Sequence, residues 1–237
     1  MRIRFGIIVC EETTPLLRKL GVGSRARLYE DWLGQVASKA NFKTYLAYND
    51  RLPVKADECD AYIISGSRHN ISEQLAWMQP LFNFLRITAK AQIPVIGLGF
   101  GNQAIAHALG GRAGPASGWS IGRHTWKLVR DEGWLQVGGK TVSLFAFSRN
   151  QVVKLPSRSI RIVSGSGCPN AAFRVANHSV GIHGHPEYSA RHIELLLAEY
   201  ADQIPEAAAE AARTSLNDGP IDVTAVANWA AHFAYRG

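Results

Sequence analysis

The feature that most constrains the fold is the stretch PVIGLGFGNQAIAHALGG, at residues 94–111. An apolar run of strand length, Val95 to Leu98, passes through Gly99-Phe100-Gly101 into a segment with helical apolar spacing. A strand that turns sharply into a helix is where α/β enzymes present a nucleophile, because the turn lifts its side chain above the sheet and onto the helix N-terminus. The apex here is Gly99, which has no side chain. The stretch therefore predicts the scaffold of a nucleophile elbow without its attacking group.

Strand-like and helix-like segments alternate over the first half of the chain. The run Ile3 to Val9 is continuously apolar, as expected for a strand buried on both faces of a parallel sheet. Further strands are expected at 44–48, in CDAYIISGS (59–67) and at 95–98, with helices at 28–39 and 75–91 and another after the elbow. This alternation favours an α/β fold, a doubly wound and mostly parallel sheet with helices on both faces. Ligand sites in such folds lie at the carboxyl ends of the strands, where the loops 65–67 and 99–101 fall.

The pattern changes between about Gly118 and Val180. Shorter strand-like pieces occur there, HTWKLV, TVSLFAF, IRIVSGS, AAFRVA and SVGIHG, and predict a small antiparallel extension joined to the main sheet. Amphipathic helices are expected at 190–200, 207–215 and 223–235. Because the chain shows no internal repeat and no linker, and its 237 residues suffice for one large core, we expect a single domain over residues 1–237.

Charge and cysteine content narrow the classes of function. The net charge is +7, but the basic residues are scattered, so we expect a basic surface or an acidic small substrate and no nucleic-acid partner. Cys10, Cys59 and Cys168 form no CxxC pair and lack metal-ligand spacing, which favours a reducing cytoplasm over a disulfide framework or a zinc site. No apolar run approaches the ~18 residues of a membrane span, so no membrane partner is expected.

The elbow GLGFGNQ (97–103), together with GHPEY (184–188), resembles the class I glutamine amidotransferase family. In that family a G-[ILV]-C-x-G-x-Q elbow supplies a cysteine nucleophile, and a later H-P-E supplies a histidine base and the glutamate that orients it. The stretches ISGSRHNISE, LGGRAGPASGWSIG and CPNAAF extend the resemblance over most of the chain, which looks closest to free-standing members. The resemblance implies a flavodoxin-like fold, hydrolysis of a γ-carboxamide by a Cys-His-Glu triad, and glutamine or a γ-glutamyl-like small molecule as ligand. No cofactor is expected.

His185 and Glu187 stand where the resemblance places the base and its orienter. They are two residues apart, so on a strand their side chains would share a face, while Pro186 between them restricts the backbone. A carboxylate bonded to one imidazole nitrogen fixes the tautomer and leaves the other nitrogen to take a proton from a thiol. The amides of Phe100 and Gly66 are candidates for an oxyanion hole, because small residues let N–H groups approach a carbonyl.

Three positions depart from the family pattern. Gly99 stands where the family has its cysteine, Asn102 where it often has histidine, and Arg149 in a segment where relatives often carry a histidine. Three differences around one site fit a naturally altered site better than a single engineered replacement. A nucleophile elbow strains a non-glycine residue by about 1–3 kcal/mol, and glycine relaxes that strain while keeping the turn. Asn102, Arg149 and Gln103, which matches the motif's glutamine, are the candidate substrate-binding residues.

Simpler interpretations stay open for several of these residues. His185 and Glu187 could be a structural hydrogen-bonded pair, and Arg149 either attracts a carboxylate ligand or is a solvated arginine at a strand end. His183 and His185 have the spacing of two metal ligands, but no third ligand accompanies them, so no metal site is expected. Cys10 is a displaced nucleophile or, as is common, a small buried cysteine at a strand end.

Three functions are therefore considered. The first is a class I glutamine amidotransferase-like domain whose glutaminase activity is absent or severely reduced, because His185 without a positioned thiol loses covalent catalysis. The second is a non-catalytic subunit that keeps the pocket for a γ-glutamyl-like ligand or docks on a synthetase as its partner. The third is an active amidotransferase or γ-glutamyl hydrolase whose cysteine was changed to Gly99 by engineering.

Overall fold

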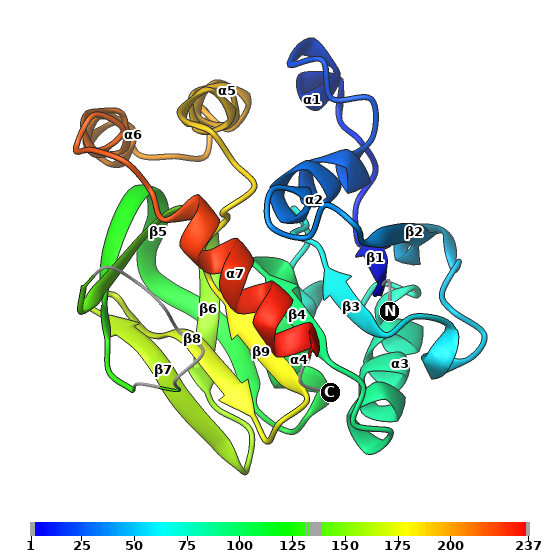
Figure 1. The fold of residues 1–237 in the computed structure, drawn as a ribbon. Coiled ribbons are helices and arrows are strands. Elements are labelled where there is room, and N and C mark those ends of the chain that lie inside the picture. Colours follow the sequence, from blue (N-terminus) through cyan, green and yellow to red (C-terminus); the bar gives the residue numbers. More distant parts are fainter. Residues whose placement is uncertain (1–2, 131, 133–138, 236–237) are drawn as a thin grey trace.

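The computed structural model describes residues 3–130, 132 and 139–235. Within these residues a nine-stranded sheet has the order β2-β1-β3-β4-β9-β8-β7-β5-β6 (Figure 1). Its strands are β1 (Arg4–Val9), β2 (Asn41–Leu46), β3 (Ala61–Ile64), β4 (Val95–Leu98), β5 (Arg112–Leu128), β6 (Thr141–Lys154), β7 (Ser159–Gly165), β8 (Cys168–Val175) and β9 (Ser179–Ile182). The helices are α1 (Pro15–Lys19), α2 (Arg25–Gly34), α3 (Met78–Lys90), α4 (Phe100–Ala108), α5 (Ala190–Glu199), α6 (Glu206–Ser215) and α7 (Val223–Tyr235).

Alternating apolar residues divide β1 between two cores, because successive side chains of a strand point to opposite faces. Phe5, Ile7 and Val9 belong to a cluster that includes residues of α2 and α7, whereas Ile8 belongs to a cluster with residues of α3 and α4. Each face of the parallel strands is thus covered by a pair of helices. This confirms the predicted doubly wound arrangement.

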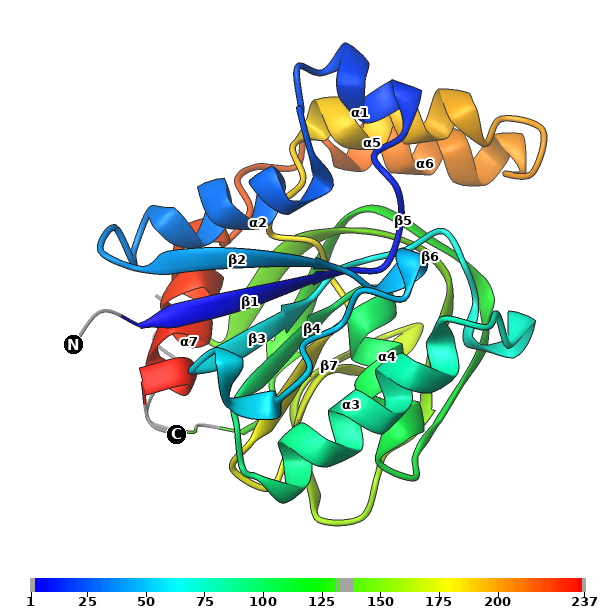
Figure 2. The same cartoon turned by 90° about the vertical axis from the view of Figure 1, so that its right-hand side faces the viewer.

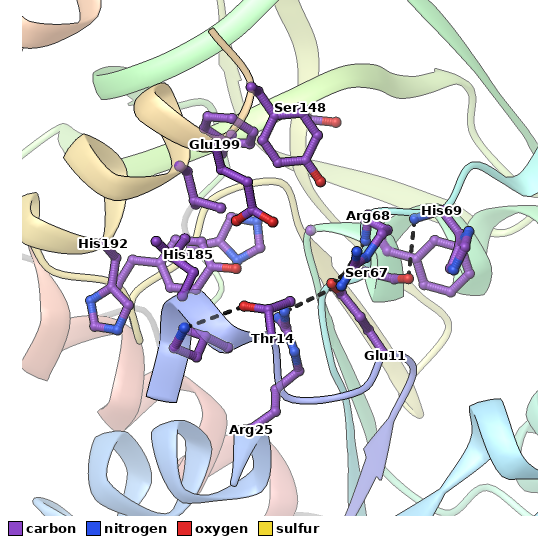
Figure 3. A pocket seen from close by; sticks show the side chains of 18 of the residues that line it. Glu11, Thr14, Arg25, Ser67, Arg68, His69, Ser148, His185, His192 and Glu199 are labelled. Atoms are coloured by element: carbon purple, nitrogen blue, oxygen red, sulfur yellow. Dashed lines mark hydrogen bonds and ion pairs between the residues drawn. The ribbon is translucent and has the colours of Figure 1, made fainter. Parts of the chain in front are cut away.

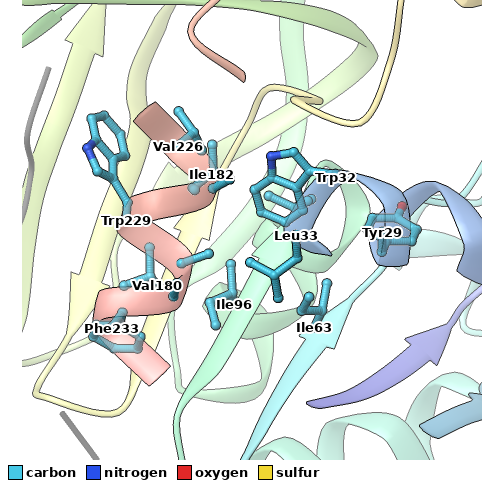
Figure 4. Close-up of a cluster of buried hydrophobic side chains, with 14 of the residues drawn as sticks. Tyr29, Trp32, Leu33, Ile63, Ile96, Val180, Ile182, Val226, Trp229 and Phe233 are labelled. Carbon is cyan, nitrogen blue, oxygen red and sulfur yellow. The ribbon is translucent and has the colours of Figure 1, made fainter. Parts of the chain in front are cut away.

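The cluster under α2 and α7 joins helices that lie far apart in the sequence. Trp229 and Phe233 of α7 lie over β9, and Trp32 and Leu33 of α2 lie on the same face of the sheet (Figure 4). The indole N–H of Trp32 donates to the carbonyl oxygen of Val223 at 3.2 Å, which ties α2 to the start of α7. The C-terminal helix therefore completes the core of the parallel strands.

Three parallel strands end side by side at one edge of the sheet. The register pairs Leu98, the last residue of β4, with Ile182, the last residue of β9. On the other side of β4 lies β3, which runs parallel to it and ends at Ile64. The loops that follow these strands carry Gly66, Gly99 and His185, so the fold brings three separate motifs to the edge where open α/β sheets bind ligands.

The antiparallel part of the sheet is larger than the small extension expected from the sequence. β5 spans 17 residues and β6 spans 14. The segment 112–118, rich in Gly, Pro and Ser, lies within β5 because pairing with β6 continues across a register shift between Pro115 and Ser120. SVGIHG was also assigned wrongly to the extension. It contains β9, which pairs parallel with β4 and antiparallel with β8 and so joins the two halves.

Three helices lie near the carboxyl edge of the sheet, and two of them, α5 and α6, were predicted at 190–200 and 207–215. Apolar residues of α5 and α6 pack on Ile121 of β5 and Phe145 of β6. α1, which the sequence did not predict, is a five-residue helix that contacts α5 (Figure 2). The hydroxyl of Thr14 accepts from the amide of Leu17 at 3.3 Å and caps this helix.

Within the described part of the chain, none of the helices is long and apolar enough to cross a membrane.

Candidate active site

Gly99 forms the apex of a sharp turn between β4 and α4. Its backbone has φ 55° and ψ −110°, a conformation that residues with a Cβ atom adopt only under strain. Its amide donates to the carbonyl oxygen of Ile182 at 3.0 Å, and its carbonyl oxygen accepts from the amide of Gln103 at 3.4 Å. The turn thus has the strained geometry of a nucleophile elbow, and a glycine occupies it without the usual cost.

His185 and Glu187 lie together above this turn, in the segment that follows β9. Nδ1 of His185 is 2.7 Å from Oε1 of Glu187, and both side chains are buried. The amide of His185 donates to the carbonyl oxygen of Phe145 at 2.7 Å, so a bridge to β6, rather than a continuing β9, fixes this residue. The pair is therefore arranged as a base and its orienter require, with Nε2 left for a ligand or a proton.

The imidazole of His185 fills the space that a side chain at position 99 would use. A Cβ atom on Gly99 would lie 2.4 Å from Cε1 and 2.5 Å from Nε2 of the ring, and one on Gly66 would lie 2.8 Å from Cε1. The ring of Tyr188 stacks on His185 with centroids 4.3 Å apart and planes 6° apart. The imidazole is thus held between two glycines and an aromatic ring.

The two expected oxyanion donors differ in availability. The amide of Phe100 is the first of α4, where an amide has no acceptor within the helix. The amide of Gly66 instead donates to the hydroxyl oxygen of Tyr29 at 2.9 Å. Burial raises the pKa of Tyr29 well above its usual value, so this hydroxyl stays neutral. The amide of Gly66 is therefore already bound to Tyr29 in this structure, and its role as an oxyanion donor stays a prediction that requires this bond to open.

One pocket brings most of the expected residues together (Figure 3). Gly99, Phe100, Gln103, Arg149 and His185 all line it. The amide nitrogen of Gln103 lies 3.5 Å from the hydroxyl of Ser148 and 3.4 Å from the carbonyl oxygen of Asn150, which directs this side chain toward β6. The guanidinium of Arg149 lies over the ring of Trp119, 4.8 Å from its centroid. The side chain of Arg149 is thus exposed to solvent, lines the pocket and makes a cation–π contact with Trp119.

Asn102 lies elsewhere, which corrects its assignment to substrate binding. It is fully buried, and it is not among the described residues that line the pocket. A Cβ atom on Gly181 of β9 would lie 2.5 Å from its side-chain oxygen, so the side chain of Asn102 packs against that strand. The helical turn that points Gln103 toward the pocket points its neighbour into the sheet.

A buried group of charges beside the pocket was not foreseen. Glu11, just after β1, is 3.0 Å from Nη2 of Arg25 and 2.7 Å from Nε of Arg68. Arg25 and Glu11 are both buried, whereas the side chain of Arg68 is 41% exposed and lines the pocket. The position of Glu11 and Arg68 after strand ends was a usable signal. Nothing in the local pattern distinguishes Arg25 from an ordinary helix residue.

Cys10 and the possible metal ligands were the other candidate reaction centres. Cys10 is buried, its thiol lies 3.7 Å from the carbonyl oxygen of Ile8, and burial raises its pKa to about 12. It is therefore not the displaced nucleophile considered from the sequence, because its reactive thiolate is suppressed. Among the described residues, no group of three or more His, Cys, Asp or Glu side chains could hold a metal ion.

The sequence is similar to those of several known proteins, at low sequence identity. No protein-family model matches the sequence. γ-Glutamyl peptidase 3 of Arabidopsis thaliana is 26% identical over 156 residues, which are 62% of this chain and 61% of that protein. The glutamine-hydrolysing GMP synthase of Porphyromonas gingivalis is 25% identical over 158 residues, covering 65% of this chain and 30% of the synthase. The match thus spans less than two thirds of either relative.

A solved structure supports the same fold over the whole chain. The glutamine amidotransferase of Methylobacillus flagellatus superposes with a TM-score of 0.78 at 19% identity, covering all of this chain and 94% of that one. At this identity the likeness shows the fold alone. The chain is thus similar in fold to a glutamine amidotransferase and, over about two thirds of its length, similar in sequence to a γ-glutamyl peptidase and to part of a glutamine-hydrolysing synthase.

Proposed function

We propose that this chain is a class I glutamine amidotransferase-like protein that binds a γ-glutamyl compound and lacks glutaminase activity. The observation that carries the proposal is Gly99, which stands at the apex of the elbow and against the ring of His185 without a side chain. Covalent cleavage of a γ-carboxamide requires a nucleophile at this point. His185 and Glu187 have the geometry to accept a proton, but the atom that would attack is missing.

The cysteines of the chain do not supply that atom. Cys10, Cys59 and Cys168 are its three cysteines, and all are buried. Burial raises the pKa of both Cys10 and Cys168 to about 12, so both remain thiols at neutral pH. His185 can still act as a general base that activates a water molecule, but this reaction proceeds without a covalent enzyme intermediate. Any remaining hydrolysis is therefore slow in this account.

The ligand follows from the pocket and from the relatives. Two relatives are named as a γ-glutamyl peptidase and a glutamine-hydrolysing synthase, and both names concern an amide at the γ-carbon of glutamate. Arg68 and Arg149 offer cationic groups for the ligand's carboxylate, and Gln103 offers an amide. In this proposal residues 1–237 form one domain that works in the cytoplasm, with no nucleic-acid or membrane partner.

Calorimetric titration with L-glutamine and L-glutamate tests the binding part of the proposal. We expect glutamine to bind, and Arg149→Ala to weaken the affinity by about tenfold because a charge-assisted contact is lost. Arg51→Ala removes an exposed arginine outside the pocket and serves as the matched control. Absence of heat with either ligand, at protein concentrations that detect a millimolar affinity, contradicts the proposal.

A regulatory subunit of a synthetase is the second candidate. The match to a glutamine-hydrolysing GMP synthase favours this candidate, because the matched residues make up 65% of this chain but only 30% of the synthase. A domain that binds glutamine without cleaving it could report glutamine supply to a separate synthetase. Affinity purification from the native organism, with and without glutamine, tests this candidate by the identity of the co-purified protein.

The proposal treats Gly99 as the natural residue. Reading codon 99 in the native gene checks this directly. A cysteine codon there would favour an active amidotransferase or γ-glutamyl hydrolase in which Gly99 is an engineered change.

A further inference from the structure

One buried carboxylate joins the loops that follow β1 and β3. These strands are parallel neighbours, and their register pairs Ile8 with Ile64, so Glu11 and Arg68 both leave the sheet at its carboxyl edge. Oε2 of Glu11 accepts from the amide of Arg68 at 2.9 Å, and Oε1 accepts from Nε of Arg68 at 2.7 Å. The two oxygens of one carboxylate therefore hold both the backbone and the side chain of Arg68.

Arg25 of α2 holds the same carboxylate from the buried side. Its Nη2 lies 3.0 Å from Oε2 of Glu11, and the two side chains are only 6% and 7% exposed. Breaking a buried ion pair leaves an unpaired charge away from water, so this pair keeps its geometry. The side chain of Arg68, in contrast, is 41% exposed and lines the pocket (Figure 3). The group thus consists of a fixed buried pair and one arginine that reaches the space for a ligand.

The charges of this group favour an anion in the pocket. Two arginines share one carboxylate, so one positive charge remains in excess. Within the described residues, the side-chain contacts of Arg68 run through Nε to Glu11, which leaves Nη1 and Nη2 for a ligand. A guanidinium binds a carboxylate through two parallel N–H donors. When its direction is fixed beforehand, less side-chain entropy is lost on binding.

Arg149 reaches the pocket without a comparable support. Its side chain is exposed and lies over the ring of Trp119, 4.8 Å from the centroid. A cation–π contact keeps a guanidinium near the face of a ring but does not bond its nitrogens in one direction. Of these two pocket arginines, Arg68 is therefore the one whose direction is set before a ligand arrives.

We propose that Glu11 is a positioning residue of this pocket and that it directs Arg68 toward the carboxylate of the ligand. This inference rests on the proposed function and adds the roles of two residues at the same site. Charge repulsion alone would make removal of Glu11 favourable for a ligand's carboxylate. If Glu11 acts by directing Arg68, its removal has the opposite effect and weakens binding.

Calorimetric titration with L-glutamine tests this opposite sign. We expect Glu11→Gln to weaken the affinity by about tenfold, because the charge-assisted contact of Arg68 loses its direction. Arg68→Lys should weaken it by a similar factor, since lysine keeps the charge but not the two-point geometry. Glu12→Gln is the matched control, because Glu12 is exposed, pairs with Arg18 and does not line the pocket. It should leave the affinity unchanged.

A double-mutant cycle shows whether Glu11 acts through Arg68. Arg68→Ala should weaken binding by at least tenfold, and adding Glu11→Gln to it should cause no further loss. Thermal unfolding of each variant shows that the titrated protein is folded. The N–H resonance of Arg68 Nε, assigned by its loss in Arg68→Lys, reports the bond to Glu11 without any ligand. We expect it to be protected from exchange with solvent in the unaltered chain and to lose this protection in Glu11→Gln.

The outcomes separate the positioning role from the proposed function. Unchanged affinity in Arg68→Lys overturns the inference and leaves the γ-glutamyl pocket standing, even if Glu11→Gln does not fold. Additive losses in the cycle also overturn it, because Glu11 then acts independently of Arg68. An Arg68 Nε resonance that stays protected in Glu11→Gln has the same consequence. Failure of the unaltered chain to bind L-glutamine overturns the proposed function, and the role of Arg68 toward its ligand with it.

Discussion

A Cβ atom on Gly99 would lie 2.4 Å from Cε1 of His185, well inside the distance at which nonbonded carbons meet. The ring has little room to withdraw, because Glu187 holds Nδ1 at 2.7 Å and Tyr188 stacks at 4.3 Å. The backbone at Gly99 also has a positive φ, which side chains disfavour. Two independent features of the structure thus select glycine at the position where the family resemblance calls for a nucleophile.

Alanine at position 99 should destabilise the protein. We expect Gly99→Ala to lower the free energy of unfolding by about 1–3 kcal/mol, from the strained backbone together with the contact to the ring of His185. Urea unfolding measures this change. Gly118→Ala is the control, because a Cβ atom there meets nothing within 4 Å and φ is not positive. Equal stability of Gly99→Ala and the unaltered chain would show that the ring yields freely.

Restoring cysteine should not by itself restore glutaminase activity. In Gly99→Cys the new side chain has to displace the imidazole from which it would need a proton, and the amide of Gly66 is still bound to Tyr29. We expect ammonia release from glutamine to stay at background in this variant. Adding Tyr29→Phe frees the amide of Gly66, and any recovered activity should appear only in the double variant. Strong turnover by Gly99→Cys alone contradicts the packing described for His185.

Removing the carboxylate of Glu11 should expose the cost of a buried charge. Glu11→Gln leaves Arg25, which is buried, without its ionic partner, and loss of one member of a buried pair costs about 3–5 kcal/mol. The neighbouring Glu12 offers a matched control, since it pairs with Arg18 at 3.7 Å and both side chains are exposed. Glu12→Gln should change stability by less than about 1 kcal/mol. Similar losses for both variants in chemical unfolding would contradict this contrast.

Protonation of His183 in the unfolded state should lower the free energy of unfolding as the pH falls. Burial lowers its pKa from 6.5 to about 3, so the folded state keeps this histidine neutral where the unfolded state takes up a proton. Its contribution to stability is therefore lost as pH falls from 6.5 toward 3, by about 1.4 kcal/mol per pH unit.

Unfolding free energies measured between pH 7 and pH 4 test this assignment. His183→Phe should reduce the slope over this range, because the most strongly shifted of the histidines that protonate on unfolding is gone. Substitution of the exposed His232 by Asn should leave the slope unchanged. An unaltered slope in His183→Phe would assign the dependence to other groups.

The central strands of the parallel half were predictable because β1, β3 and β4 are continuous apolar runs, whereas β2, with Asn41, Lys43 and Thr44, was expected at 44–48 and lies at Asn41–Leu46. β4 at Val95–Leu98 and α7 at Val223–Tyr235 were placed at their observed bounds. β9 was misassigned because its own residues do not show whether a neighbouring strand is parallel. The length of β5 was missed because Gly and Pro near 114–118 indicate a turn, whereas pairing with β6 carries the strand through them.

The sequence motifs predicted the residues of the site that lie within one short segment. The spacing of His185 and Glu187 within one segment indicated their contact, and the structure joins them at 2.7 Å. The bond of the Gly66 amide to Tyr29 and the packing of Asn102 against Gly181 were not foreseen, because Tyr29 and Gly181 come from elements distant in sequence. Contacts of this kind depend on tertiary packing, and no local pattern encodes them.

Ammonia release from L-glutamine by the purified chain, with Gly99 in place, tests most directly whether the site lacks glutaminase activity. We expect no release above that of His185→Asn measured in parallel, at glutamine concentrations that saturate binding in the calorimeter. Turnover well above the His185→Asn variant would contradict it, because it would show that this site cleaves a γ-carboxamide without a nucleophile at position 99.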